Sequence, residues 1–342
     1  MFNPIHVLWI LAAPWIISSS GAAVITTPYI ALHSVPKYAQ AKSLPYANPQ
    51  APKGGILIQA ADGSFDNLNS MNGKGNVTEG INYIFDSLMS KSLDEPGVYY
   101  PLLAEKVSFD PKQTAYIIFH LNPKARFSNG QPVTAKDVKY SFDLYQTQSN
   151  FGLQMYLADI KKTEVLSPLK VKISFKSRHN PEMAMIVTQM PIYSQQEWQK
   201  RNFKDINLKP ILGSGPYVID RIDAGRSISY KRNPYYWGKD LLVNRGRYNF
   251  DRIQYRYYRS PEIKFEAFKS GQFTLHEEKQ VNRWVSDYRF PAVQQGQIKT
   301  YRFLHHNPIP TQSLIFNTRR QPFADIRFRQ ALTLAYDFEW LN

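Results

Sequence analysis

The chain has 342 residues, 43% of them hydrophobic and 20% charged, which is typical of a globular protein with a buried core and not of a disordered chain. It contains no cysteine, which excludes a disulfide scaffold, a thiolate zinc site, a cysteine nucleophile and an N-terminal cysteine for lipid attachment. Its 42 lysines and arginines against 27 aspartates and glutamates give a net charge of +15, so an anionic partner has to be considered.

The N-terminus carries the pattern of a secretory signal. No Asp, Glu, Lys or Arg precedes Lys37, residues 7–17 form an apolar run, and residues 18–23 are small. This pattern is typical of a signal peptide, which we place at residues 1–23. The absence of Lys or Arg before the run leaves two alternatives, an uncleaved anchor and a buried apolar segment. The run is shorter than the ~20 residues of a membrane span, so we expect a periplasmic protein without a lipid anchor.

The next elements are an arm, a strand and a helix. Residues 24–53 are expected to form an N-terminal arm, since their second half is rich in Pro, Ala and small polar residues. The apolar run 56–58, bounded by glycine, predicts a buried strand. Thr78 is a residue type that caps helices, and the apolar residues behind it have helical spacing. Those residues are Ile81, Ile84, Phe85 and Leu88.

Two hairpins and a helix are predicted in the middle of the chain. Residues 107–109 and 115–121 flank a turn that contains Pro111, which predicts a hairpin. Thr134 and Asp137 have the spacing of a capping box before an apolar stripe, which predicts a helix start. Residues 165–175 predict a second hairpin around Ser167-Pro168.

The last third alternates strands and helices. A sharp loop at 213–216 precedes a strand at 217–220, and apolar residues alternate with polar ones along 250–258, as in a half-exposed strand. Pro261 opens a helix that stops at Gly271. A strand is expected at 312–316, and a helix beginning at Asp325. Strands and helices interleave throughout, which favours an α/β or α+β fold.

No group of residues predicts catalysis. Gly213-Ser214-Gly215 lacks the following Lys-Ser/Thr and precedes a strand, so it is interpreted as a turn and not as a phosphate loop. His305-His306 has no carboxylate partner nearby, and adjacent residues of an extended chain point to opposite faces. Glu277-Glu278 has no evident acid/base partner. We therefore expect no catalytic residue, no metal and no cofactor, and a binding protein in preference to an enzyme.

A basic stretch at residues 219–270 holds 12 Lys/Arg against 6 Asp/Glu, interleaved with tyrosines. Basic and aromatic residues together suit single-stranded nucleic acid, because the charges bind phosphate and the rings stack on bases. The same alternation describes a half-buried strand with one solvated face. We prefer the strand, because an exported chain rarely meets nucleic acid, and expect no nucleic-acid partner.

Many short blocks occur together in an order that resembles the family 5 extracellular solute-binding proteins, the peptide and nickel receptors of ABC importers. They include residues 101–105, 119–121, 126–132, 134–138, 213–217, 232–237, 316–317 and 322–337. Further blocks resemble the Yej-type oligopeptide and microcin C receptors within this family. They are residues 48–55, 65–69, 94–97, 244–251, 265–271 and 337–340. The resemblance covers about residues 45–342, and members of the family are substantially longer.

The resemblance implies an α/β fold, a two-lobed periplasmic-binding protein of class II, peptide-receptor type, with mixed sheets and a second lobe that is incomplete in this chain. Lobe I would comprise residues 54–71 and 210–272, with a subdomain at 72–209. Lobe II would begin in residues 273–342. The family's mechanism is closure of two lobes around the ligand.

The resemblance further implies a monomeric receptor that captures an oligopeptide and delivers it to an inner-membrane ABC permease and its ATPase. The cleft walls would include the loop after the first strand, the pair Glu277-Glu278 and the strand at 312–316. Glu277 or Glu278 would bind a peptide α-amino group. The alternative is that they are exposed surface carboxylates, and the same two interpretations apply to Asp62. The candidate ligand-binding residues are Ala61, Asp62, Gly63, Ser64, Phe65, Glu277, Glu278, Gln312 and Ser313.

Two other functions stay open at this point. The same fold binds nickel chelates, heme or opine-like solutes in other receptors, and the histidine content near the cleft would separate these from peptides. An exported hydrolase, or a basic protein that grips an anionic polymer of the envelope, would also be consistent with the charge of +15.

Overall fold

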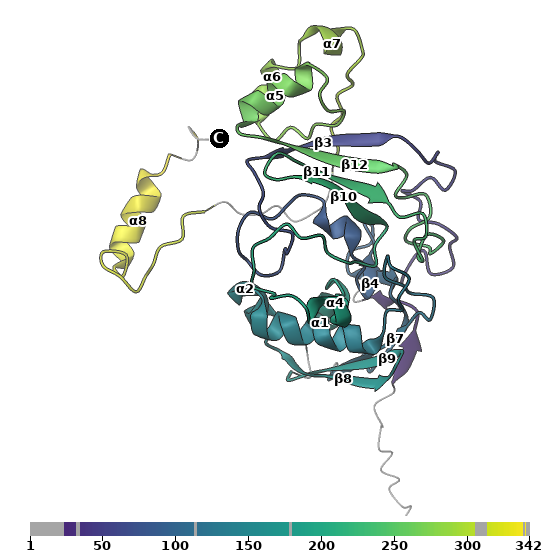
Figure 1. Cartoon of the computed structure of the whole chain (residues 1–342). Coiled ribbons are helices and arrows are strands. Elements are labelled where there is room, and N and C mark those ends of the chain that lie inside the picture. The colour runs from purple at the N-terminus through teal and green to yellow at the C-terminus, as the bar shows by residue number, and fades with distance from the viewer. Residues whose placement is uncertain are drawn as a thin grey trace, which may run out of the picture. The chain divides into compact units, whose positions relative to one another are not determined.

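The computed structural model describes residues 24–31, 35–112, 115–177, 180–304, 313–337 and 339 (Figure 1). The chain divides into two compact units, residues 1–284 and residues 285–342. The expected signal peptide at 1–23, His305-His306 and Gln312 lie outside the described residues. Within the described part, no helix combines the length and the apolar character that crossing a membrane requires.

A four-stranded mixed sheet is the part of the first unit that positions the site. Its strand order is β10-β11-β12-β3, with β3 (Ile56–Asp62) parallel to β12 (Arg252–Tyr258) and the other pairs antiparallel. The predicted strands at 56–58 and 250–258 are both confirmed, and Ile253 and Tyr255 are buried as the alternation requires. The remaining two strands are β10 (Tyr217–Asp223) and β11 (Ser227–Arg232).

A five-stranded antiparallel sheet forms a second layer of the first unit, with strand order β1-β6-β7-β9-β8 (Figure 1). Both predicted hairpins are confirmed, since β6 pairs with β7 and β8 pairs with β9. A small sheet of order β2-β5-β4 completes the strands. The bounds are β1 Ile25–Thr27, β2 Ile30–Ala31, β4 Met89–Lys91, β5 Val98–Pro101, β6 Ala104–Phe109, β7 Tyr116–Leu121, β8 Ile160–Ser167 and β9 Lys170–Phe175.

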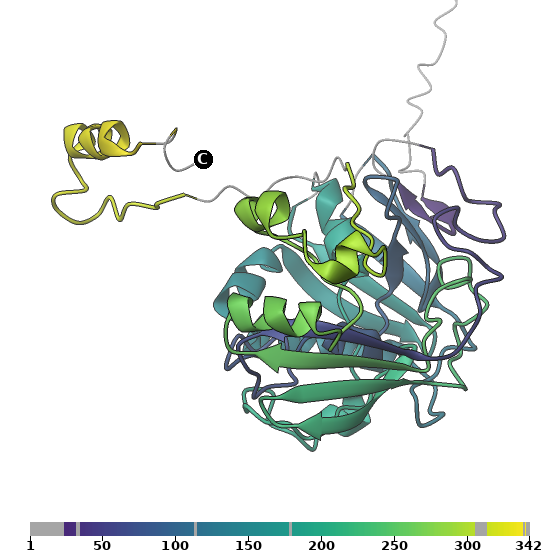
Figure 2. The same ribbon diagram turned by 90° about the horizontal axis from the view of Figure 1, so that it is seen from above.

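Two helices of this unit show why the sequence folds as it does. Helix α1 (Ala135–Gln148) packs on the five-stranded sheet and begins at the predicted capping box, in which Thr134 N–H donates to Asp137 Oδ2 at 2.8 Å. Helix α5 (Pro261–Lys269) packs against β12 and β3 and stops before Gly271, as predicted (Figure 2). The remaining helices of residues 24–286 are α2 Phe151–Tyr156, α3 Pro181–Thr188, α4 Gln195–Trp198 and α6 Val281–Ser286.

The prediction of a helix after Thr78 is wrong in both the type and the length of the element. The structure has a single 3₁₀ turn, Ile81–Ile84, which follows Gly80 in a left-handed conformation. Phe85 is extended, and the chain then enters β4, which pairs with β5. Pairing with a strand from later in the chain therefore overrides the local helical spacing.

In the second unit, α8 (Ile326–Ala335) confirms the helix predicted from Asp325, whose carboxylate accepts from Arg327 N–H at 2.8 Å. The strand expected at 312–316 is wrong for the residues that can be described, because 313–317 carry no regular secondary structure. None of the described strands is paired with this segment. The second unit also contains α7 (Pro291–Gln294).

The Gly213-Ser214-Gly215 segment packs against the 3₁₀ turn. A Cβ on Gly213 would lie 1.8 Å from the carbonyl oxygen of Ile84, and one on Gly215 would lie 2.5 Å from that of Tyr83. Gly215 N–H donates to Ile84 O at 2.9 Å. The glycines are therefore needed for close approach of two backbones.

Asp86, just after the 3₁₀ turn, is a buried carboxylate with aromatic partners. It is 3% exposed, and it accepts from Tyr236 Oη–H at 2.8 Å and from Trp237 Nε1–H at 2.9 Å. Burial raises the pKa of Asp86 to about 7, although the hydrogen bonds oppose this shift. The contacts tie the segment after the 3₁₀ turn to the loop that follows β11.

The substitution Gly213→Ala should lower the free energy of unfolding by about 1–3 kcal/mol, because overpacking against a backbone carbonyl forces the backbone to move. Urea unfolding would measure the change. Gly152→Ala is the control, since Gly152 lies in α2 with no foreign backbone atom near its Cβ position. Equal unfolding midpoints for Gly213→Ala and the wild type would contradict the packing role.

Stability should fall with rising pH through the titration of Asp86. Its folded-state pKa lies above the ordinary 3.8, so its contribution is fully present below pH 4 and is lost as pH rises through about 7. Between pH 5 and 7 the free energy of unfolding should decrease by about 1 kcal/mol per pH unit from this group. Asp86→Asn should flatten that slope in denaturant titrations, and an unchanged slope would rule out Asp86 as its source.

Candidate ligand-binding site

Two parallel strands end together at one edge of the four-stranded sheet. Asp62 at the end of β3 is the register partner of Tyr258 at the end of β12, and Gly63 N–H donates to Tyr258 O at 2.8 Å. The loop after β3 and helix α5 after β12 therefore both start at this edge. Ligands of open α/β sheets bind outside the carboxyl ends of parallel strands, which makes this edge the candidate site.

The chain returns to the same edge after α5. Thr274 N–H donates to Ile58 O at 3.3 Å, and Leu275 forms a parallel bridge with Gln59. The next residues along this segment, Glu277 and Glu278, therefore lie beside the end of β3. The structure thus brings together two of the three predicted groups, the loop after β3 and the glutamate pair.

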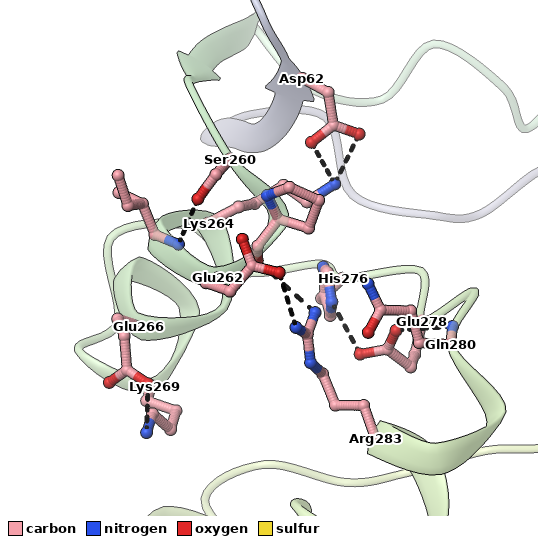
Figure 3. Close-up of polar contacts among 12 residues, drawn as sticks. Asp62, Ser260, Glu262, Lys264, Glu266, Lys269, His276, Glu278, Gln280 and Arg283 are labelled. Carbon is pink, nitrogen blue, oxygen red and sulfur yellow. Dashed lines mark hydrogen bonds and ion pairs between the residues drawn. The ribbon is translucent and has the colours of Figure 1, made fainter.

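Asp62 forms an ion pair with α5. Its Oδ1 and Oδ2 lie 2.6 and 2.8 Å from Lys264 Nζ (Figure 3). The Lys264 side chain is 16% exposed, whereas that of Asp62 is 62% exposed. Because the carboxylate faces water, the pair adds little stability, about 0–1 kcal/mol. It orients an otherwise accessible carboxylate at the strand end.

Glu278 and His276 form a buried pair. Each side chain is 5% exposed, and His276 Nε2 lies 3.4 Å from Glu278 Oε2. The other carboxylate oxygen accepts from Gln280 N–H at 2.8 Å. Burial lowers the pKa of His276, against the pull of Glu278, and favours the neutral imidazole. The His276 ring packs against Phe265, Phe268 and Phe273, with centroids 5.1–6.2 Å apart.

A second charged contact joins α6 to α5. Arg283 Nη2 lies 3.8 Å from Glu262 Oε1 (Figure 3). The Arg283 guanidinium also lies 4.8 Å from the centre of the Phe265 ring. The Arg283 side chain is 10% exposed, so its stem covers α5 while Glu262 stays in water. These contacts fix the segment that carries the glutamate pair to the helix.

The other predicted residues differ in exposure. Ala61 and Phe65 are 5% and 2% exposed, and the Phe65 ring packs 4.8 Å from that of Tyr257, so both side chains belong to the core. Gly63 has φ +76°, which a turn directly after the strand requires. Ser64 and Glu277 are exposed, and in the described part of the chain Glu277 makes no side-chain hydrogen bond or ion pair.

The third predicted group falls in the second unit. Gln312 lies outside the described residues. Ser313 belongs to the second unit, where it is exposed and outside any strand.

The sequence reasoning missed Lys264, His276, Arg283 and Glu262. Lys264 could have been predicted if β3 and β12 had been recognised as parallel neighbours. The helix that follows β12 then begins beside the end of β3, where Asp62 lies. His276 and Arg283 gave no comparable signal, because their partners depend on the return of residues 274–276 along β3. Among the described residues, no three of His, Cys, Asp and Glu are grouped to hold a metal ion.

Comparisons with known proteins agree with this architecture. Protein BMEII0691 of Brucella melitensis is 40% identical over 308 residues, 87% of this chain and 50% of its own length. YejA of Escherichia coli is 34% identical over 99% of this chain and 56% of its own length. The probable peptide-binding protein YejA of Agrobacterium fabrum is 36% identical over 87% of this chain and 50% of its own length. The chain spans about half the length of the curated relatives it matches.

Solved structures share the fold at low identity. NikZ from Campylobacter jejuni, in complex with Ni(L-His), aligns with a TM-score of 0.62 at 20% identity, over 83% of this chain and 54% of NikZ. The oligopeptide-binding protein AppA from Bacillus subtilis, in complex with a nonapeptide, aligns with a TM-score of 0.58 at 17% identity, over 70% and 47%. These likenesses confirm the expected fold of the periplasmic binding proteins.

The family itself is shown by the sequence. Residues 98–342 match the model of the bacterial extracellular solute-binding proteins, family 5 middle part. This match confirms the resemblance inferred from the short blocks, and the YejA relatives confirm its narrower part. The chain therefore belongs to family 5 of the bacterial extracellular solute-binding proteins.

Proposed function

We propose that this chain serves as the substrate-binding component of an ABC importer and captures oligopeptides. In this proposal it is exported by residues 1–23, acts as a monomer in the periplasm, and delivers its ligand to an inner-membrane permease and ATPase. Membership of family 5 supports a receptor role over catalysis. The name of the Agrobacterium relative and the nonapeptide in AppA support peptides as the ligand class.

One observation carries the choice of site: the exposed carboxylates of Asp62 and Glu277 come from segments that meet at the end of β3. Asp62 already has Lys264 as a partner, whereas Glu277 has none among the described side chains. A peptide offers an α-ammonium group, which a carboxylate binds through a charge-assisted hydrogen bond. We therefore assign the α-ammonium to Glu277, with Asp62 and Ser64 as neighbouring polar contacts.

Glu278 has a different role in this proposal. Its carboxylate is buried beside His276, so in this proposal it holds the segment in place and does not meet the ligand. Ala61 and Phe65 support the loop from the core, and Gly63 permits its turn. We assign lobe I to the four-stranded sheet with its subdomain at 72–209, and the start of lobe II to residues 273–342, including Gln312 and Ser313.

The substitution Glu277→Gln should weaken binding of a peptide with a free N-terminus about tenfold, because one charge-assisted hydrogen bond of ~1.5 kcal/mol is lost. Isothermal titration with the same peptide, free and N-acetylated, would measure this. The acetylated peptide should bind the wild type and the variant equally.

Glu266→Gln is the matched control, since Glu266 is an exposed carboxylate on α5 that pairs only with Lys269 among the described residues. Unchanged affinity in Glu277→Gln, and in a variant with Glu278→Gln added, would remove this role from the pair while leaving peptide binding intact. No binding of any peptide by the wild type would instead overturn the proposed function.

A further inference from the structure

A basic pocket lies in the first unit, lined by the end of the N-terminal arm and the loop between β11 and β12. It has a volume of about 340 Å³. The share of liquid volume that one water takes is roughly 30 Å³, so the pocket has room for a polyatomic ion. Five cationic side chains line it: Lys53, Arg232, Lys239, Arg245 and Arg247.

The pocket is far from the candidate peptide site. Lys53 precedes β3 and Arg232 ends β11, whose register places it next to the start of β12. The peptide site lies at the opposite ends of β3 and β12, six residues further along each strand than their first residues, Ile56 and Arg252. At about 3.3 Å per residue, the two sites are separated by about 20 Å.

The charges in the pocket are only partly neutralised. Asp240 lines it, and Asp251 forms an ion pair with Arg232. Five cations against these two carboxylates leave a net charge of +3. Burial lowers the pKa of Lys53, and the neighbouring Arg232 guanidinium lowers it further.

Two donors in the pocket have no acceptor among the described residues. The Nε–H of Arg232 is buried and has no hydrogen-bond partner among the described residues. Lys239 is exposed, and its ammonium makes no hydrogen bond or ion pair within the described part of the chain. By contrast, Lys53 Nζ donates to Arg247 O and Asn249 Oδ1, which orders the wall of the pocket. Buried donors without a partner call for a water or an ion.

We propose that this pocket binds a phosphoryl group, with Arg232 and Lys239 as its principal donors. A phosphate monoester carries about −1.5 to −2 charge and three acceptor oxygens, which matches a net +3 field and unfilled donors better than a single carboxylate does. Arginine presents its donors in a planar fork that suits phosphate oxygens. The phosphoryl group can come from a soluble phosphate or from phosphatidic acid, whose headgroup is a phosphate monoester, and the experiment separates these sources.

The test uses the full chain, inorganic phosphate, and phosphatidylcholine vesicles with or without phosphatidic acid. Isothermal titration measures phosphate binding and co-sedimentation measures vesicle binding. The double variant Arg232→Gln with Lys239→Ala should bind at least about tenfold more weakly, because each lost charge-assisted hydrogen bond is worth ~1.5 kcal/mol. Wild-type binding should weaken as salt is raised.

The control variant Arg221→Gln with Lys204→Ala removes the same charge from exposed side chains that have no described partner. It should bind like the wild type. Phosphate binding that only the pocket variant loses supports a soluble phosphate; loss limited to vesicles that contain phosphatidic acid supports a headgroup. Binding to neither probe by the wild type, or equal loss in both variants, overturns the proposal. Peptide affinity at the other end of the strands should not change in the pocket variant.

Discussion

The parallel pairing of β3 with β12 is the constraint on which the rest of the first unit depends. These strands occupy residues 56–62 and 252–258, so the chain must cross from one edge of the sheet to the other before β12 begins, and it adds β10 and β11 to the same sheet on the way. Because the strands are parallel, their ends meet at one edge and their starts at the other. The first edge unites Asp62, Lys264 and the glutamate segment. The second edge unites Lys53, Arg232 and Asp251 around the basic pocket.

Aromatic residues with polar tips make this long excursion possible. The chain between β3 and β12 is anchored where Tyr236 and Trp237 donate to Asp86, and where Tyr230 Oη–H donates to Glu79 O at 2.6 Å. Each ring buries apolar area while its donor satisfies a buried acceptor. Glycines at 213 and 215 then let the chain pass directly against the 3₁₀ turn. The buried Asp86 carboxylate makes the stability of this junction sensitive to pH. The parallel strands β3 and β12 contain no Asp or Glu before Asp62 at the end of β3.

Local signals predicted the elements that they determine. Three of these signals act over a few residues and are confirmed by the structure. They are the capping box of Thr134 and Asp137, the alternation in 250–258, and the start and end of α5 at Pro261 and before Gly271. The spacing of Ile81, Ile84 and Phe85 failed because β4 pairs with a strand that the local sequence does not specify. The candidate site was reached through family resemblance for Asp62 and the glutamates. The resemblance did not predict the roles of Lys264 and His276. The position of Lys264 follows from the parallel register of β3 and β12, and that of His276 from its packing against Phe rings of α5.

The glutamate pair shows how the fold divides two identical residues. Adjacent side chains on an extended segment point to opposite faces, so only one of Glu277 and Glu278 can turn toward α5. Phe265, Phe268 and Phe273 surround His276, and its imidazole is one of the polar partners of the buried Glu278 carboxylate. A carboxylate there without such a partner would be costly. Glu277 is consequently left in water with its charge unpaired among the described residues, which is the state that a ligand carrying an ammonium group requires.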